Sequence, residues 1–215
     1  MTTATAATPD TAPRSTREPV DFWFDATCPW AWMTSRWMLE VEKIRDIEIR
    51  WHFMSLSVLN EGRELAKGYQ ALMDKAWLPA RVITAASILH GPEVVGPLYT
   101  AIGTRIHPGG QKNFREAVAG GLADVGLPAD LIEYGDTDTY DEQLRASHAD
   151  GISRVGQDVG TPVIAVAGTA FFGPIVTPAP KGEAAGKLWD GVLAVAQTPG
   201  FYEIKRTRDA RPDFS

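Results

Sequence analysis

The single cysteine of the chain has the clearest potential for chemistry. Cys28 follows the apolar run 20–25 after a short turn that ends at Thr27, and it comes directly before Pro29, so it lies where a buried strand gives way to the first turn of a helix. Unpaired backbone N–H groups and the positive end of the helix dipole stabilise a thiolate there. Such positions lower a cysteine pKa from about 8.5 to between roughly 3.5 and 7.5. We therefore expect Cys28 to be a nucleophile; the alternative is a small apolar residue that fills the core.

The rest of the composition limits the other kinds of chemistry. Hydrophobic residues make up 44% of the chain and charged residues 22%, as in an ordinary globular protein. The formal net charge of -6 provides no basic field for nucleic acid. The four histidines have no metal-like spacing with one another or with Cys28, so we expect no metal site. No strand-glycine-helix loop indicates a flavin or nicotinamide, and we expect no bound cofactor.

The expected location follows from the cysteine count and the first residues. One cysteine forms no internal disulfide and is typical of a reducing compartment. Residues 1–19 are rich in Thr, Ala and Pro and lack the features of a signal peptide, so we expect a flexible tail. No apolar run is long enough to cross a bilayer, which predicts no membrane partner. A cytoplasmic location is the expectation.

The elements that must position Cys28 follow from hydrophobic periodicity. Residues 20–25 predict a buried strand, and 47–54 alternate apolar and polar residues as a second strand does. Between them, apolar residues recur at spacings of three and four after Pro29, which predicts an amphipathic helix. A right-handed crossover then makes the two strands parallel.

The remainder of the chain predicts a helical block followed by a hairpin and a last helix. Helical spacing recurs over 65–77, 82–89, 95–102, 114–125 and 138–157. Two short strands follow at 163–166 and 170–172, and the helix 183–196 is expected to bury Ala184, Leu188, Val192 and Val195. The order indicates an α/β thioredoxin fold with an all-helical domain inserted after the second strand. The expected units are 20–63 with 159–204, the insertion 64–158, and an exposed tail 205–215.

Several segments together resemble the DsbA-like thioredoxin superfamily, in particular the actinobacterial mycothiol-dependent reductases and nitroreductases. The segments are Asp25-Ala-Thr-Cys28-Pro-Trp-Ala-Trp32, Met54-Ser-Leu, Asn60-Glu, Val159-Gly-Thr-Pro162, Phe171-Phe-Gly-Pro174 and Gly186-Lys-Leu-Trp189. The resemblance implies mycothiol or a similar low-molecular-weight thiol as co-substrate. It also implies that Cys28 attacks a small disulfide, a protein mixed disulfide or an electrophile such as a nitro-aromatic compound.

Ala31 departs from the family pattern. The redox form of the family reads Cys-Pro-Trp-Cys, and this chain has Ala31 where the resolving cysteine belongs. Cys28 can still form a mixed disulfide, but an external thiol must release it. The chain is therefore either a natural monothiol enzyme or a variant in which the mixed disulfide is trapped, and the sequence leaves both open.

The resemblance and the local pattern indicate further residues at the site. By resemblance, Thr161-Pro162 matches the cis-proline of thioredoxin folds, so Thr161 would offer its backbone to a thiol ligand. Pro29 and Trp30, on the exposed first turn, are expected to contact substrate, Trp30 as an apolar wall. Asp25 either tunes proton transfer at the thiol or has a plain turn role, which we favour.

Two residues near the start of the helical block are weaker candidates. Asn60 and Tyr69 lie where the second strand gives way to that block and would line a substrate pocket. The simpler alternatives are helix capping for Asn60 and core packing for Tyr69.

Two other functions fit parts of the pattern. Glutathione-transferase-kappa and chromene-carboxylate isomerase enzymes share this fold, but they use a hydroxyl where this chain has Cys28. A non-catalytic binding module, whose redox role was lost with Ala31, predicts an unperturbed Cys28 thiol.

Overall fold

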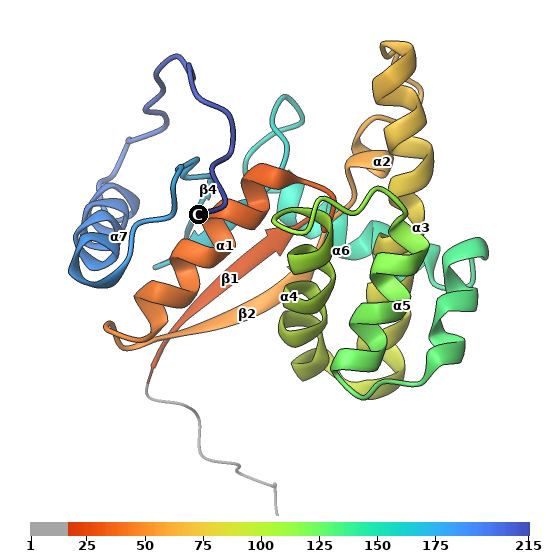
Figure 1. Ribbon diagram of the computed structural model, residues 1–215. Coiled ribbons are helices and arrows are strands. Elements are labelled where there is room, and N and C mark those ends of the chain that lie inside the picture. Colours follow the sequence, from red (N-terminus) through yellow and green to blue (C-terminus); the bar gives the residue numbers. More distant parts are fainter. Residues whose placement is uncertain (1–16) are drawn as a thin grey trace, which may run out of the picture.

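One four-stranded sheet forms the centre of the molecule in the computed structural model, which describes residues 17–215 (Figure 1). Most of the tail expected over 1–19 thus lies outside the described residues. The strands are β1 (Glu18–Phe24), β2 (Ile47–Phe53), β3 (Val163–Val166) and β4 (Thr169–Phe172), in the order β2-β1-β3-β4. β1 is parallel to β2 and antiparallel to β3, and β3 pairs with β4 as a hairpin. The expected α/β architecture is confirmed, although β1 begins at Glu18, inside the segment expected to be tail.

Two helices beside the sheet pack against each other through a pair of tryptophans. α1 (Pro29–Glu42) starts with the proline that the sequence indicated, and α7 (Gly182–Ala196) packs beside it. The rings of Trp37 and Trp189 lie 6.2 Å apart, and Trp37 Nε1 donates to the carbonyl of Ala185 at 3.0 Å. The expected face of α7 was right only in part: Leu188 and Val192 pack partly buried against the core, but Ala184 is exposed, and the buried side chains are Ala185, Trp189 and Ala196. The bulk of Trp189 decides which face turns inward.

The helical block differs from the sequence expectation in its first part. Its helices are α2 (Leu56–Leu59), α3 (Lys67–His90), α4 (Val95–Ile106), α5 (Phe114–Asp124) and α6 (Asp141–Ser153), with short 3-10 turns at Pro92–Val94 and Ala129–Asp136. The helices expected at 65–77 and 82–89 are one continuous helix, α3, with Pro79 inside it. A proline inside a helix costs about 3 kcal/mol. Burial of Met73 and Ala76 before Pro79 and of Val82 and Ile83 after it outweighs that cost.

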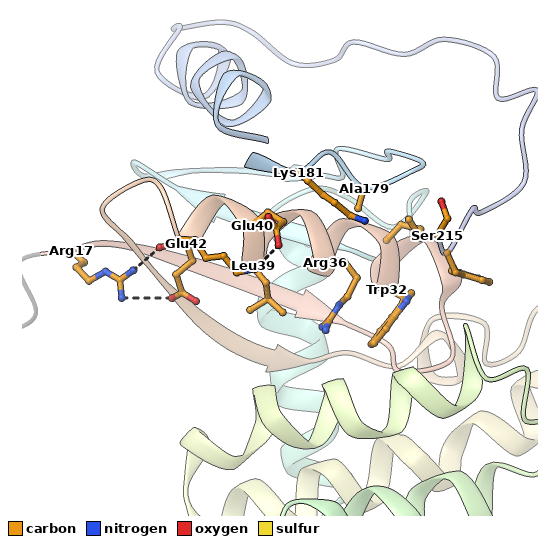
Figure 2. A pocket seen from close by; sticks show the side chains of 12 residues that line it. Arg17, Trp32, Arg36, Leu39, Glu40, Glu42, Ala179, Lys181 and Ser215 are labelled. Carbon is orange, nitrogen blue, oxygen red and sulfur yellow. Dashed lines mark hydrogen bonds and ion pairs between the residues drawn. The ribbon is translucent and has the colours of Figure 1, made fainter. Parts of the chain in front are cut away.

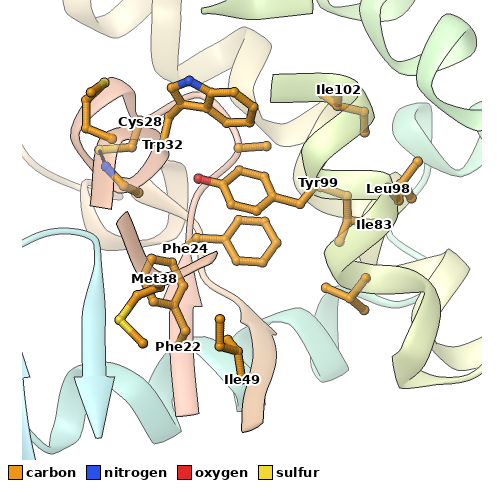
Figure 3. Packing of buried hydrophobic residues seen from close by; sticks show 14 of the residues in the cluster. Phe22, Phe24, Cys28, Trp32, Met38, Ile49, Ile83, Leu98, Tyr99 and Ile102 are labelled. Carbon is orange, nitrogen blue, oxygen red and sulfur yellow. Dashed lines mark hydrogen bonds between the residues drawn. The ribbon is translucent and has the colours of Figure 1, made fainter. Parts of the chain in front are cut away.

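The block meets the sheet through an aromatic stack. Tyr99 of α4 is fully buried and lies over Phe24 of β1 with ring centroids 3.7 Å apart. Trp32 of α1 meets the same tyrosine edge-on at 5.8 Å (Figure 3). Helix α4 approaches Trp32 closely because Gly103 has no side chain there. This stack holds the start of α1 against the helical block.

The last residues return to the start of α1. Residues 205–215 are mostly exposed, as expected, but they run back toward α1 (Figure 1). The guanidinium of Arg208 lies 4.8 Å from the centroid of the Trp30 ring, and the ring of Phe214 lies 5.8 Å from that of His107. The backbone N–H of Asp213 donates to Thr177 Oγ1 at 2.7 Å. The exposed tail therefore contacts the rest of the protein at Arg208, Asp213 and Phe214.

Candidate functional site

Cys28 occupies the N-cap position of α1. Its Sγ atom accepts a hydrogen bond from the N–H of Ala31 at 3.4 Å and donates to the carbonyl oxygen of Thr161 at 3.5 Å. The residue is 6% exposed. The thiol therefore lies between the first turn of α1 and the turn before β3, at the helix N-terminus that the sequence indicated.

The electrostatics of the thiol differ from the expectation based on the helix terminus. Burial raises the pKa of the Cys28 thiol above its ordinary value, and the negative charge of Asp25 acts in the same direction. The hydrogen bonds with Thr161 and Ala31 lower this pKa but do not offset the loss of hydration. The low pKa expected from the sequence was wrong for this arrangement, because desolvation of the thiolate is the largest effect.

Asp25 supports the turn that carries Cys28. Its buried carboxylate accepts from the N–H and the hydroxyl of Thr27 at 2.7 and 2.6 Å, and from the N–H of Leu56 at 2.7 Å. Burial raises the pKa of this carboxyl, while these hydrogen bonds lower it. The contacts link the end of β1 to the start of α2, which fixes the direction in which the chain enters α1.

His107, at the end of α4, is a positioning residue that the sequence analysis missed. Its Nε2 lies 3.0 Å from the carbonyl oxygen of Ala26 and therefore carries the proton as donor. Burial lowers the pKa of His107 from 6.5 to about 4, so the ring is neutral near pH 7. The only sequence signal was the helix break at this point, because nothing local connects His107 with a loop 81 positions away.

The turn before β3 supplies the other wall of the site. The Thr161–Pro162 peptide bond is cis, and Thr161 is 3% exposed. Its carbonyl accepts from the Cys28 thiol, whereas its buried hydroxyl has no hydrogen-bond partner within residues 17–215. Ala31 is fully buried next to Cys28. A buried donor without a partner at this position is available to a ligand.

The structure places the three remaining candidates on different elements: Trp30 on α1, Asn60 at the end of α2 and Tyr69 on α3. Trp30 is half-buried on the first turn of α1, under the guanidinium of Arg208. Tyr69 is 39% exposed, and burial together with negative charge at Cys28 and Asp25 raises the pKa of its hydroxyl. Asn60 is the C-cap residue of α2, and its side chain donates to the carbonyl of Leu56 at 2.8 Å, which is the capping role expected as the simpler alternative. Of these residues, Tyr69 on α3 is near enough for charge at Cys28 to act on its hydroxyl.

Among residues 17–215, no three His, Cys, Asp or Glu side chains gather as a metal ion would require. Within the same residues, no helix combines the length and the apolar character needed to cross a membrane.

Sequence comparison identifies relatives over nearly the whole chain. The model of the family described as "Rv2466c-like: Mycothiol-dependent nitroreductase Rv2466c" matches residues 27–206. The uncharacterized protein Rv2286c of Mycobacterium tuberculosis is 32% identical over 194 residues, which cover 88% of this chain and 82% of that protein.

Solved structures with the same fold include redox proteins and an isomerase. DsbM from Pseudomonas aeruginosa, a cytosolic disulfide reductase determined with GSH, is 17% identical with a TM-score of 0.53 over 81% of this chain and 99% of its own. A probable DsbA oxidoreductase, SCO1869 from Streptomyces coelicolor, is 16% identical with a TM-score of 0.53 over 90% and 95% of the two chains. A 2-hydroxychromene-2-carboxylate isomerase is 13% identical with a TM-score of 0.56 over 82% and 93%. At these identities the likeness shows the DsbA-like thioredoxin fold alone.

Proposed function

The chain belongs to the Rv2466c-like family of mycothiol-dependent nitroreductases, and on this basis we propose that Cys28 is the nucleophile of an oxidoreductase that uses a low-molecular-weight thiol such as mycothiol. The observation that carries the proposal is the placement of Cys28 Sγ between the N–H of Ala31 and the carbonyl of Thr161. A backbone donor directed at sulfur stabilises a thiolate, and the Thr161 carbonyl, which accepts from the thiol in this structure, can pair with an extended thiol ligand once that proton has left.

The proposed reaction has two exchange steps. The Cys28 thiolate attacks one sulfur of a disulfide, the S–S bond breaks, and the leaving thiolate takes a proton from water. A second, external thiolate then attacks the mixed disulfide and regenerates Cys28. The first step releases one thiol of the substrate, and the second uses one external thiol and leaves its sulfur in a new disulfide, so the number of S–S bonds is unchanged; full reduction of the substrate takes a second external thiol. With Ala31 in place of a resolving cysteine, the second step depends on the external thiol.

Burial of Cys28 disfavours the formation of its thiolate. Burial is the largest cause that keeps the proton on Cys28. We therefore propose that the thiolate forms when substrate enters and Trp30 moves with the overlying Arg208. Thr161, Pro162, Asn60 and Tyr69 are the proposed walls of the substrate site.

The substrate class follows from the family. We propose small disulfides or electrophiles such as nitro-aromatic compounds as substrates, and protein mixed disulfides as a further possibility. A low-molecular-weight thiol is the proposed partner, as the DsbM structure with GSH illustrates for a protein of the same fold. The proposed location is the cytoplasm, where such thiols keep a lone cysteine reduced.

Intact-mass spectrometry after incubation with mycothiol disulfide tests the proposal. We expect one mycothiol adduct on the folded protein, removal of that adduct by reduced mycothiol, and no adduct on Cys28→Ser. Ala31→Cys is the matched variant: its adduct should give way to an internal disulfide, seen as the loss of two hydrogens. A folded protein that forms no adduct, while its denatured chain does, would contradict the role of Cys28.

A further inference from the structure

A cavity of about 780 Å³ runs along α1, beginning one helical turn after Cys28 (Figure 2). We call it the α1 cavity. Trp32, Met33, Leu39 and Phe214 provide apolar lining, and Arg36 and Lys181 provide positive charge. In Figure 2, Trp32 and Arg36 project from the same side of α1, and Lys181 approaches from the segment before α7. Neither Cys28 nor Thr161 lines this cavity.

Arg36 is held in a fixed orientation without an acidic partner. Its guanidinium lies 4.0 Å from the centroid of Trp32, and burial lowers the pKa of Arg36. Nε donates to Ser35 Oγ at 3.2 Å and Nη2 to Thr100 Oγ1 at 3.1 Å, which are both neutral hydroxyls. Within residues 17–215, Arg36 has no ion pair and its Nη1 has no hydrogen bond.

Arg81 makes the same kind of stacking contact but has an acidic partner. Its guanidinium lies 4.7 Å from the centroid of Trp77, but Nε and Nη2 donate to the two carboxylate oxygens of Asp141 at 2.8 and 2.7 Å. A planar guanidinium stacked on a ring presents its edge for such bidentate pairing. In Arg36 the same two nitrogens donate to neutral hydroxyls, so among residues 17–215 its charge lacks the anion that Arg81 has.

The acidic side chains that line the α1 cavity, Glu40 and Glu42, have partners other than Arg36. Glu40 pairs with Lys43 and accepts weakly from the N–H of Gly182 at 3.5 Å. Glu42 lies 3.8 Å from a nitrogen of Arg17. Neither carboxylate forms an ion pair with Arg36, and no ion pair joins Arg36 to Ser215, the last residue of the chain, which also lines the cavity; among residues 17–215 the partly desolvated cation therefore has no acidic partner.

We propose that the α1 cavity binds a small aromatic carboxylate. The carboxylate accepts hydrogen bonds from the N–H groups of Arg36 Nη1, which have no partner among residues 17–215, and Lys181 adds attraction from the rim. The aromatic ring packs against Leu39, Met33 and Phe214, which are the apolar side chains that border the charge. The site does not require the chemistry of Cys28.

Titration of the full chain with benzoate, followed by NMR of the Arg36 Nε–H and Trp32 Nε1–H signals, tests this site. We expect saturable shifts of both signals, and affinities at least about tenfold weaker for benzamide, which lacks the charge, and for acetate, which lacks the ring. Arg36→Met should weaken benzoate binding about tenfold or more, and Lys181→Met about threefold.

Two further variants serve as a charge control and as a replacement for an Arg36 variant that does not fold. Arg115→Met removes the same charge from the exposed surface of α5 and should leave benzoate binding unchanged. If Arg36→Met does not fold, Arg36→Lys keeps the charge without the planar fork and should bind benzoate with reduced affinity. Equal binding of benzamide and benzoate, unchanged binding by a folded Arg36 variant, or the absence of saturable shifts would each overturn the proposal.

Discussion

The thiol of Cys28 donates to the carbonyl oxygen of Thr161, although the two residues are 133 positions apart in the chain. The contact joins the first turn of α1 to the cis Thr161–Pro162 turn before β3. It also closes the site, because both residues are almost completely buried. The nucleophile and the backbone group that would receive its ligand are therefore already paired with each other.

Titration of Cys28 by ultraviolet absorbance should give a higher pKa in the folded protein than in the denatured chain, because burial disfavours the thiolate. The folded state holds the thiol proton more tightly, so the protonated Cys28 contributes to the folding stability. This contribution is fully present below the unfolded pKa of about 8.5 and is lost as pH rises through the folded pKa. Cys28→Ser should lack this loss. A folded pKa below the denatured one would show that the helix N-terminus dominates instead.

Removal of the Thr161 hydroxyl should not destabilise the protein. Thr161→Val deletes a buried donor that has no partner within residues 17–215, so we expect an unfolding free energy in urea that is unchanged or higher by about 1 kcal/mol. Thr34→Val is the control, because the buried Thr34 hydroxyl donates to the carbonyl of Pro174 at 2.8 Å. It should lose about 1 kcal/mol. Equal losses in both variants would show that the Thr161 hydroxyl has an internal partner.

His107 should make stability depend on pH below neutrality. Its folded pKa of about 4 lies below the ordinary 6.5, so the unfolded chain binds the proton first. The part of the folding stability that depends on a neutral His107 is present above the unfolded pKa. It is lost as pH falls from 6.5 toward 4, by about 2–3 kcal/mol. The unfolding free energy of His107→Phe should lose this slope, and that of His90→Asn, at an exposed position, should keep it. A slope that persists in His107→Phe would assign it to other groups.

Gly103 should not tolerate a side chain. A Cβ at this position would overlap the ring of Trp32, so Gly103→Ala should lower the unfolding free energy by about 1–3 kcal/mol and shift the Trp32 indole resonance. Gly191→Ala, in α7, meets no atom within 4 Å. It should gain about 0.5–1 kcal/mol from helix propensity. A tolerated Gly103→Ala would mean that α4 can move away from α1.

The sequence predicted most of the elements but not all of their bounds. β1, α1, β2 and the β3–β4 hairpin carry strong local patterns, and each lies within a few residues of its expected position. The interruption expected around Pro79 was wrong, because burial on both sides of the proline keeps α3 continuous. Local propensity decides where a helix can break, and packing decides whether it does.

The sequence by itself determined that this chain has one candidate nucleophile, Cys28, at the start of a helix, and no resolving cysteine at position 31. Those facts depend on residues that are adjacent in the chain. Only the tertiary structure decided that His107 holds the loop before Cys28, that Thr161 covers the thiol, and that Arg36 has no acidic partner among residues 17–215. It also reversed the direction expected for the pKa of Cys28. The physical reason is that hydration and partner charges depend on which distant segments pack together, and no local pattern encodes that.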